Sequence, residues 1–391
     1  MMIQRNLASQ LELLSRQYPV VTVTGPRQSG KTTLVKAVLP DWTYVSLETP
    51  DVREYALRDP HGFIEAHPER IILDEVQRAP DLFSYIQTHV DDRGREGMYV
   101  LTGSFNFGLM EGISQSLAGR VAVLELLPLA FPEMNRAGVL PDSIENLMIS
   151  GGYPRIYDRG LTPQQWYANY VTTYLERDVR KVKNISDLSV FQRFLKMCAA
   201  RSGQILNLTS LGDDCGITHN TAKSWLSILE ASYIVFLLKP HYQNFNKRLI
   251  KSPKIYFCDS GLLSYLIGVP DSHALLTHAS RGHVFETWVI SELLKGRLNR
   301  GLRDNLYFWR DNTGHEIDCL VDQGERLLPI EIKSGKTVSE DFFKGLRFWC
   351  RISGTEARDT VLVYAGVMDQ KRKEGQVLSW RSFGKALPME I

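Results

Sequence analysis

The chain has 391 residues, of which 43% are hydrophobic and 23% are charged, and its formal net charge is +2. A chain of this length ordinarily folds as about two to four domains, because a single hydrophobic core stops growing well before it. The near-neutral charge excludes a globally basic protein, so any nucleic-acid partner would have to bind local patches.

The five cysteines are scattered without the spacing of a zinc site, which favours a reducing compartment over a disulfide framework. No apolar run reaches the length of a membrane span. The N-terminus is amphipathic at helical spacing and lacks the continuous apolar core of a signal sequence. We therefore expect a soluble cytoplasmic protein with no membrane partner.

The first motif lies between an apolar strand at 20–23 and a helical pattern that begins at Lys31, and it fits G-x-x-x-x-G-K-[ST]. Glycines at both ends of such a loop let successive N–H groups turn toward phosphate oxygens, and the helix N-terminus adds partial positive charge. Lys31 is placed to reach the β- and γ-phosphates, and Thr32 to give its hydroxyl to Mg²⁺. The predicted nucleotide-binding residues of the loop are Gly25, Pro26, Arg27, Gln28, Ser29, Gly30, Lys31, Thr32 and Thr33.

A second apolar strand, at 71–73, ends in Asp74 and Glu75. Parallel α/β sheets bind their ligands at the carboxyl ends of strands, so both side chains should face the phosphate loop. We expect Asp74 to be the second Mg²⁺ partner and Glu75 to orient or deprotonate the attacking water. An Asp-Glu pair can instead cap a helix, but its distance from the phosphate loop favours catalysis.

A third strand, at 98–101, is followed by polar residues that include Ser104. A hydroxyl there could bind the γ-phosphate or the water, or serve only as turn chemistry. Arg120 stands just before another apolar strand. As a catalytic finger it would act across a subunit boundary, which makes a homo-oligomer a conditional expectation; otherwise it is a solvated loop arginine.

These segments resemble AAA+-type P-loop ATPases in TGPRQSGKTTL (24–34), ILDEVQ (72–77), LTGS (101–104) and SLAGR (116–120). With GGYP (151–154), YLERDV (174–179) and DSGLLSYL (259–266), the chain resembles more narrowly the bacterial and archaeal ATPases that carry a C-terminal domain of unknown function. The resemblance covers nearly the whole chain. It implies ATP and Mg²⁺ as cofactors and ATP hydrolysis as the activity, and it implies no particular biological task.

The pattern changes near residue 135, and an aromatic helical run at 163–182 fits a helical lid over residues 136–200. By analogy with such lids, Arg177 could sense the nucleotide. The commoner meaning of the surrounding charged run is a solvated face.

Residues 201–268 fit a winged-helix domain, in which a turn at Gly216 and a helix capped by Thr218 precede two β-rich segments. The second helix, the usual reader of a major groove, should bury Ala222, Trp225, Leu226 and Leu229. Five Lys or Arg and no acid occur from Lys239 to Lys254, interleaved with aromatic residues. This pattern predicts a DNA partner, duplex or branched, although winged helices also bind proteins.

The last block begins with a helix expected to bury Val284, Phe285, Trp288, Val289 and Leu293. Glu286 lies near the first turn of this helix, and Asp318 lies on the second of four following strands. Glu331 and Lys333 alternate on the third strand and should therefore share one face.

This arrangement resembles the PD-(D/E)xK nuclease fold, with Ile317 where the motif has proline. The resemblance implies a Mg²⁺ site made by Glu286, Asp318 and Glu331, with Lys333 as a catalytic residue that positions or activates water. The alternative is a chance Glu-x-Lys on an ordinary strand.

We therefore predict an α/β multidomain protein with a P-loop AAA+-type ATPase core (1–135), a helical lid (136–200), a winged helix (201–268) and a restriction-endonuclease-like α/β domain (269–391). The leading hypothesis is an ATPase that engages DNA, with a Mg²⁺-dependent nuclease-like C-terminal domain. The alternative is a nucleotide-dependent switch or scaffold for a protein partner, whose nuclease-like domain is catalytically inactive. Steep salt dependence of DNA binding would distinguish the two.

Overall fold

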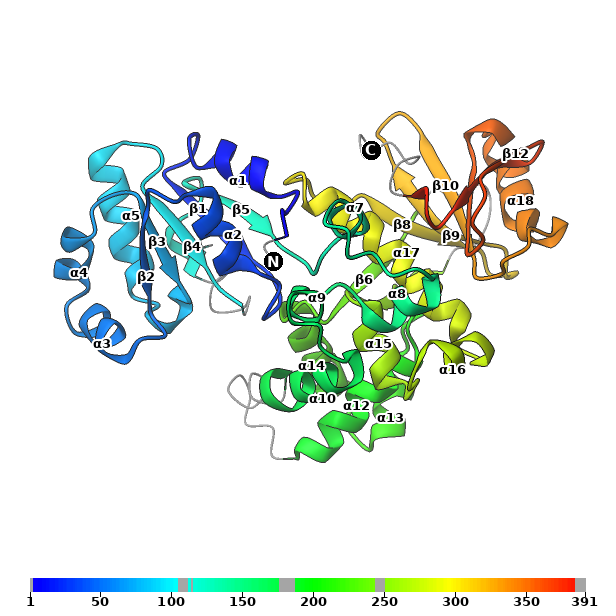
Figure 1. Cartoon of the computed structure of the whole chain (residues 1–391), viewed down its shortest axis with the longest axis horizontal. Coiled ribbons are helices and arrows are strands. Elements are labelled where there is room, and N and C mark those ends of the chain that lie inside the picture. The colour runs from blue at the N-terminus through cyan, green and yellow to red at the C-terminus, as the bar shows by residue number, and fades with distance from the viewer. Residues whose placement is uncertain (1–2, 105–111, 114, 176–186, 243–249, 384–391) are drawn as a thin grey trace. The chain divides into compact units, whose positions relative to one another are not determined.

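The computed structural model describes residues 3–104, 112–113, 115–175, 187–242 and 250–383 (Figure 1). The chain forms two compact units. The N-terminal unit comprises residues 1–129 with 231–233 and 298–302, and the C-terminal unit comprises 130–230, 234–297 and 303–391. No helix within the described ranges is long and apolar enough to cross a membrane.

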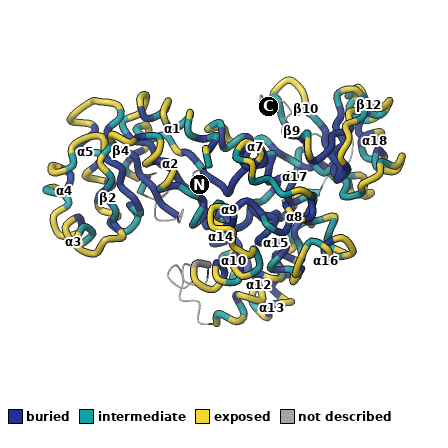
Figure 2. The backbone as a smooth tube through the Cα atoms, viewed as in Figure 1, coloured by how far each residue is buried: buried dark blue, intermediate teal, exposed yellow. Residues whose placement is uncertain are grey.

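The N-terminal unit is built on a five-stranded parallel sheet of order β2-β3-β4-β1-β5. Its central strands consist almost entirely of buried residues, as expected for a parallel sheet covered on both faces. Figure 2 shows these strands in dark blue, whereas the helices around them also carry exposed residues in yellow. The strands are β1 (Val20–Thr24), β2 (Thr43–Ser46), β3 (Ile71–Asp74), β4 (Tyr99–Thr102) and β5 (Val121–Glu125).

Two apolar clusters lie on opposite faces of this sheet, because successive residues of a strand point to opposite sides. Val21 and Ile72 pack in the cluster of α1 and α2, whereas Val20 and Ile71 pack in the cluster of α4 and α5. The helices are α1 (Ala8–Leu14), α2 (Lys31–Val38), α3 (Pro50–Arg58), α4 (Pro60–Ala66) and α5 (Leu82–Arg93), with a 3-10 turn at Val76–Arg78.

The first part of the C-terminal unit is helical. Its helices are α7 (Phe131–Arg136), α8 (Ile144–Ser150), α9 (Pro154–Arg159), α10 (Pro163–Tyr170), α12 (Leu188–Ala200), α13 (Leu208–Cys215), α14 (His219–Ala231), α15 (Ser260–Leu266) and α16 (Ser272–Thr277), with a π-helical turn at Val171–Leu175. The charged run that contains Arg177 lies outside the described residues, as do residues 243–249 of the basic segment.

The turn between α13 and α14 has the predicted chemistry. Gly216 is left-handed at φ 70°, and the Thr218 hydroxyl accepts a hydrogen bond from the Thr221 N–H at 3.2 Å. The expected inner face of α14 is buried at all four positions, which are Ala222, Trp225, Leu226 and Leu229.

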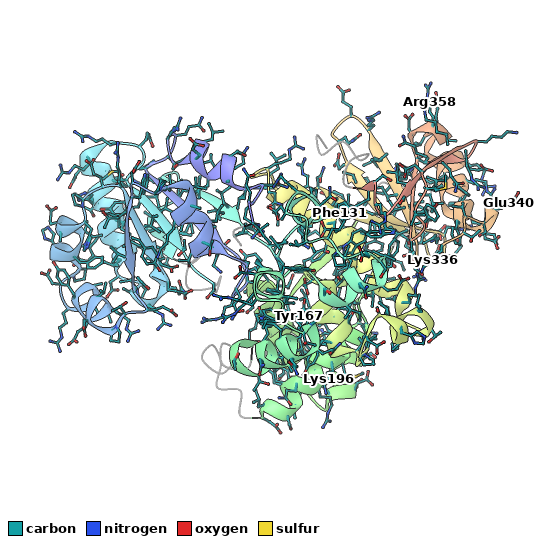
Figure 3. The ribbon with its side chains drawn as sticks, viewed as in Figure 1. Phe131, Tyr167, Lys196, Lys336, Glu340 and Arg358 are labelled. Carbon is teal, nitrogen blue, oxygen red and sulfur yellow. The ribbon has the colours of Figure 1, made fainter. Side chains whose placement is uncertain are left out.

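Asp259 joins two of the sequence motifs. Its buried carboxylate accepts hydrogen bonds from the Gly152 N–H at 2.7 Å, from the Tyr167 hydroxyl at 2.6 Å (Figure 3) and from the Leu262 N–H at 2.8 Å. A side chain at Gly151 would collide with this network, since its Cβ would lie 2.2 Å from the Tyr167 hydroxyl. The GGYP and DSGLLSYL segments therefore meet at one buried carboxylate that caps α15.

The second part of the C-terminal unit is a mixed eight-stranded sheet of order β12-β13-β11-β10-β9-β8-β6-β7. Its strands are β6 (Val235–Pro240), β7 (Lys254–Phe257), β8 (Leu306–Arg310), β9 (Glu316–Asp322), β10 (Leu327–Lys333), β11 (Val361–Tyr364), β12 (Gln370–Arg372) and β13 (Gly375–Ser379). The two β-rich segments at the end of the predicted winged helix pair with each other, and β6 also pairs in parallel with β8. These segments are therefore strands of the C-terminal sheet.

Two long helices accompany this sheet, α17 (Arg281–Leu298) and α18 (Lys344–Ser353). The burial predicted for α17 is confirmed for Val284, Phe285, Trp288 and Val289, but it is wrong for one position: Leu294 is buried and Leu293 is only half-buried. Polar residues of α17 such as Thr287 and Ser291 are buried as well. The prediction assumed one apolar stripe, whereas this helix is enclosed on several sides.

Candidate functional site

The phosphate loop connects β1 to α2 and has a backbone that demands glycine at two points. Gly25 has φ 145° and Gly30 has φ 98°, and a Cβ on Gly25 would lie 2.2 Å from the Leu126 carbonyl oxygen. Gln28 is also left-handed, at φ 61°, which is uncommon for a residue with a side chain. Strain of this kind persists only where the surrounding structure holds it, and it clusters at ligand sites.

Lys31 begins α2, and its ammonium group folds back over the loop. The Nζ atom donates to the carbonyl oxygens of Gly25 at 2.9 Å and of Pro26 at 2.8 Å. The charge therefore stands over the loop, next to the backbone N–H groups at the helix N-terminus.

Arg5 supports the loop and carries no sequence signal of its own. This buried guanidinium donates 2.6 Å hydrogen bonds to the Ser29 carbonyl and to the Leu127 carbonyl, which follows β5. It ties the N-terminal segment and the end of β5 to the loop. An isolated arginine upstream of the first strand gave no reason to predict this role.

Asp74 ends β3 and is surrounded by hydroxyl donors. Its Oδ2 atom accepts from the Thr32 hydroxyl at 3.0 Å and from the Tyr44 hydroxyl at 2.6 Å, and its Oδ1 atom accepts from Thr102. Strand register explains the grouping, because Asp74 pairs with Thr102 on β4 and β2 lies on its other side. Burial and the neighbouring Asp74 raise the pKa of Tyr44, so this phenol stays a donor. Tyr44 was missed because no motif marks it.

Glu75 follows Asp74 in a left-handed conformation, at φ 58°. Its Oε2 atom accepts from the Gln77 amide at 2.6 Å and from the Ser104 hydroxyl at 3.4 Å. The turn separates the two carboxylates, so that Asp74 meets the loop threonine while Glu75 meets the end of β4. Ser104 thus contacts Glu75.

Arg120 and the phosphate loop lie at opposite ends of the paired strands β1 and β5. Arg120 precedes β5, whose first residue pairs with Val20, whereas the loop follows the far end of β1. Its guanidinium makes a two-point ion pair with Asp91, with an Nη2–Oδ2 distance of 2.8 Å. The hydrogen bonds from Arg120 lower the pKa of Asp91. Arg120 therefore cannot reach the loop of its own chain.

The residues at the loop fit a magnesium nucleotide. The Thr32 hydroxyl and the Asp74 carboxylate, which are oxygen ligands of the kind Mg²⁺ prefers, lie in hydrogen-bond contact beside the loop. The parallel sheet, the phosphate loop after its central strand and the acidic end of β3 together define a P-loop ATPase domain of the AAA type. A family model described as an AAA domain matches residues 17–135.

Two further family models match the remainder, each described as a domain of unknown function: DUF8612 over residues 141–273 and DUF4143 over residues 281–383. Over 342 residues the chain is 32% identical to the uncharacterized proteins Rv2008c of Mycobacterium tuberculosis and Mb2031c of Mycobacterium bovis, covering 86% of this chain and 75% of each relative. The chain belongs to the same family as these mycobacterial relatives.

Among solved structures, the chain is similar to the Walker-type ATPase PABY2304 of Pyrococcus abyssi, with a TM-score of 0.47 and 14% identity over 68% of this chain and 96% of that one. It is also similar to RuvB of Thermotoga maritima, with a TM-score of 0.31 and 17% identity over 60% and 89% of the two chains. Both likenesses are too distant to bear on function.

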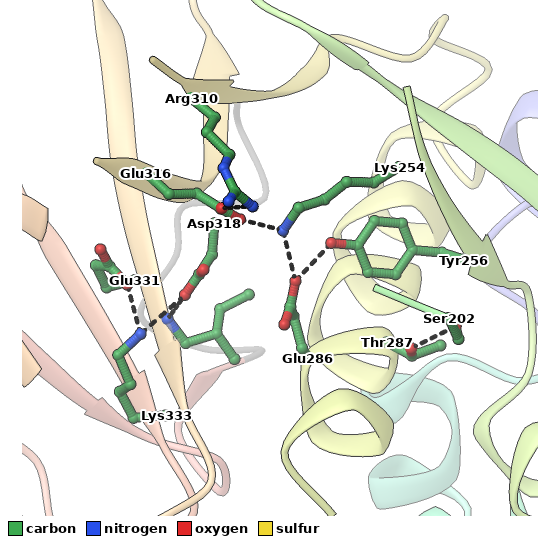
Figure 4. Close-up of polar contacts among 11 residues, drawn as sticks. Ser202, Lys254, Tyr256, Glu286, Thr287, Arg310, Glu316, Asp318, Glu331 and Lys333 are labelled. Carbon is green, nitrogen blue, oxygen red and sulfur yellow. Dashed lines mark hydrogen bonds and ion pairs between the residues drawn. The ribbon is translucent and has the colours of Figure 1, made fainter. Parts of the chain in front are cut away.

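The C-terminal unit brings three of the predicted residues together (Figure 4). Lys333 Nζ lies 2.7 Å from Glu331 Oε2 and 3.3 Å from Asp318 Oδ2, and the Ile332 N–H donates to the same Asp318 oxygen at 2.8 Å. The strand alternation predicted for Glu331 and Lys333 is thus present. Burial would lower the pKa of Lys333, but the two carboxylates outweigh it and raise that pKa.

The pKa values of Asp318 and Glu331 are shifted in opposite directions. Burial and the neighbouring Asp318 raise the pKa of Glu331 well above its ordinary value. Burial alone would also raise the pKa of Asp318, but Lys333 and hydrogen bonds outweigh it and lower that pKa to about 2. Asp318 is therefore the more acidic carboxyl group of the pair.

Glu286 has a different set of partners. Its Oε1 atom accepts from the Tyr256 hydroxyl at 2.5 Å and lies 3.2 Å from Lys254 Nζ. Lys254 also forms a close ion pair with Glu316, whose second oxygen accepts from Arg310 at 3.0 Å. Burial would lower the pKa of Lys254, but Glu286 and Glu316 outweigh it and raise that pKa.

The structure corrects the interpretation of Lys254 as part of an exposed basic patch. The residue is 3% exposed, because β7 directs its side chain inward to Glu286 on α17 and Glu316 on β9. Within the described ranges, no group of three or more His, Cys, Asp or Glu side chains is arranged to hold a metal ion. His315, another neighbour of the motif, stacks on Phe348 and lies 3.2 Å from Asp311.

Proposed function

We propose that the protein is a Mg²⁺-dependent ATP hydrolase whose chemistry takes place between the phosphate loop and the end of β3. The observation that carries the proposal is the 3.0 Å contact between Thr32 and Asp74 beside a loop covered by Lys31. This is the donor set that a magnesium nucleotide needs. Mg²⁺, when bound, would neutralise phosphate charge.

In this mechanism the backbone N–H groups from Gly25 to Thr32 bind the phosphates. Lys31 exchanges its two carbonyl partners for phosphate oxygens and stabilises the charge that develops on them. Glu75, held by Gln77 and Ser104, orients the attacking water and accepts its proton. Asp74 and Thr32 orient each other.

ATP turnover by the pure protein tests this proposal directly. Phosphate release with Mg²⁺ should be lost in Lys31→Ala and in Asp74→Asn, and it should persist in Arg58→Ala, an exposed change on α3. Binding of a fluorescent ATP analogue should fall in Lys31→Ala. Turnover unchanged in Lys31→Ala would refute the assignment.

We also propose the nuclease-like architecture for the end of the chain. The order of elements supports it: helix α17, strands β8, β9 and β10, helix α18 and strand β11. The contacts among Asp318, Glu331 and Lys333 support it further. The lid over 136–200 and the winged helix over 201–268 are proposals of the same kind; the second rests on α13, α14 and the β6–β7 pair.

DNA engagement is a second candidate function, favoured by the surface of α14. Asn220 and Lys223 are exposed on that helix, and Lys239, Tyr242 and Lys251 are exposed in the described part of the basic segment. Lysines on an exposed face can contact phosphates, and an exposed tyrosine can stack on bases.

Fluorescence anisotropy with duplex, branched and single-stranded DNA at several salt concentrations tests this candidate. Lys223→Glu should weaken binding and reduce the salt slope by about 1. The matched control is Lys196→Glu, an exposed lysine of α12 (Figure 3). Equal effects of the two variants, or no binding at all, would favour the switch that binds a protein partner.

A further inference from the structure

We propose that the ammonium group of Lys254 takes the place of a divalent metal ion in the carboxylate cluster of the C-terminal unit, so that this cluster works without a metal. The inference is independent of ATP hydrolysis, which uses other residues. It departs from the nuclease-like resemblance, which implies Mg²⁺ at these carboxylates.

The position of Lys254 is the first observation. Its Nζ atom contacts carboxylates from two different elements, Glu286 on α17 and Glu316 on β9 (Figure 4). These are the elements that would have to supply metal ligands from the helix and from the second strand. The cation that bridges them in this protein belongs to β7.

The second observation is that one oxygen each of Glu286, Asp318 and Glu331, and both oxygens of Glu316, already contact protein donors. Tyr256 donates to the same Glu286 oxygen that faces Lys254, and Arg310 donates to the second oxygen of Glu316. Asp318 accepts from Lys333 and from a backbone N–H, and Glu331 accepts from Lys333. A divalent ion that took these oxygens would have to displace their donors.

The balance of charges in the cluster also disfavours a divalent metal ion. Four carboxylates, those of Glu286, Glu316, Asp318 and Glu331, face three cations, those of Lys254, Lys333 and Arg310. At most one negative charge is left for an incoming metal ion, which would also meet the buried ammonium group. The residues present therefore do not fit a divalent metal.

The backbone holds Lys254 in this position. Lys254 pairs with Leu238 across the β6–β7 ladder and forms an isolated bridge with Ile205 on its other side. A buried lysine is tolerated only when it is paired, so the carboxylates and the lysine require one another. We infer that the cluster has a binding or structural role, and that it does not perform metal-assisted hydrolysis.

Mn²⁺ binding to the full chain without nucleotide tests the proposal, read by electron paramagnetic resonance. An Asp74→Asn background excludes metal at the phosphate loop. In this background the protein should show no Mn²⁺ site that depends on Asp318. Replacing Lys254 by Met or by Gln should create one, at least about tenfold tighter than any background binding, and adding Asp318→Asn should remove it.

Lys254→Arg is the matched control, because it keeps the cation and should stay free of Mn²⁺. The proposal would be overturned by an Asp318-dependent Mn²⁺ site in the chain that retains Lys254, or by the absence of a new site in folded Lys254→Met and Lys254→Gln. Circular dichroism establishes folding. Mg²⁺-dependent DNA cleavage that is lost in Lys333→Ala would overturn it as well.

Discussion

The Thr32 hydroxyl donates a 3.0 Å hydrogen bond to the Asp74 carboxylate, joining two residues that are 42 positions apart in the chain. The contact places the start of α2 against the end of β3, where the phosphate loop and the acidic strand end meet. Single substitutions around this contact should therefore have distinct effects on ATP turnover.

Glu75→Gln should lower kcat about 100-fold or more while ATP still binds, because the amide keeps the shape of the side chain but cannot accept the proton of water. Steady-state phosphate release and equilibrium binding of an ATP analogue measure the two effects. Glu12→Gln, an exposed change on α1, should leave both unchanged. A Glu75→Gln protein within a few-fold of normal turnover would show that another group activates the water.

Tyr44→Phe should raise the Mg²⁺ concentration needed for half-maximal turnover about three- to tenfold, since Asp74 loses its 2.6 Å donor. Tyr44 is a positioning residue, so the loss should appear in the Mg²⁺ dependence more than in kcat at saturating Mg²⁺. Tyr18→Phe, on an exposed tyrosine, is the control. Equal Mg²⁺ curves for both variants would refute the role of Tyr44.

Arg120→Ala should reduce turnover about tenfold or more only where the protein assembles, because Arg120 cannot reach the loop of its own chain. Asp91→Ala removes its ion-pair partner and should not reduce turnover. Turnover measured across a dilution series, with the assembly state followed by light scattering, separates the cases. If assembled Arg120→Ala protein hydrolyses ATP normally, the arginine has no catalytic part.

Glu145→Gln should destabilise the C-terminal unit by about 1–3 kcal/mol at pH 7, because Glu145 accepts from Arg281 at 2.9 Å and pairs with Lys336 at 3.2 Å. Burial would raise the pKa of Glu145, but these two cations outweigh it and lower the pKa. A lowered carboxylate pKa stabilises the fold above the unfolded pKa of about 4.3 and loses this effect as the pH falls through the folded pKa.

The difference in melting temperature between the original chain and Glu145→Gln should therefore stay constant from pH 8 to about pH 5 and shrink below about pH 4. Glu356→Gln is the control, since its pair with Arg358 is exposed and worth little. A difference that does not change with pH would mean that packing, and not charge, explains the effect of Glu145.

Much of the nucleotide site was predictable because its signals are local. The phosphate loop is one continuous segment, and Asp74 ends an apolar strand whose neighbours follow from the parallel order. Arg5 and Tyr44 were not predictable, because they reach the site from segments without a motif. Arg120 was identified beside the correct strand, but only the sheet register shows that it lies at the far end of the paired strands.

Local alternation likewise determined that Glu331 and Lys333 share a face, since neighbouring positions on a strand point opposite ways whatever surrounds them. Only the tertiary structure decided which cation each carboxylate meets. The basic composition around Lys254 predicted an exposed side chain that contacts phosphate. In the fold, β7 instead places this lysine in contact with Glu286 and Glu316. A charge pattern along the chain cannot reveal this, because burial and pairing are set by elements that are distant in sequence and adjacent only in the fold.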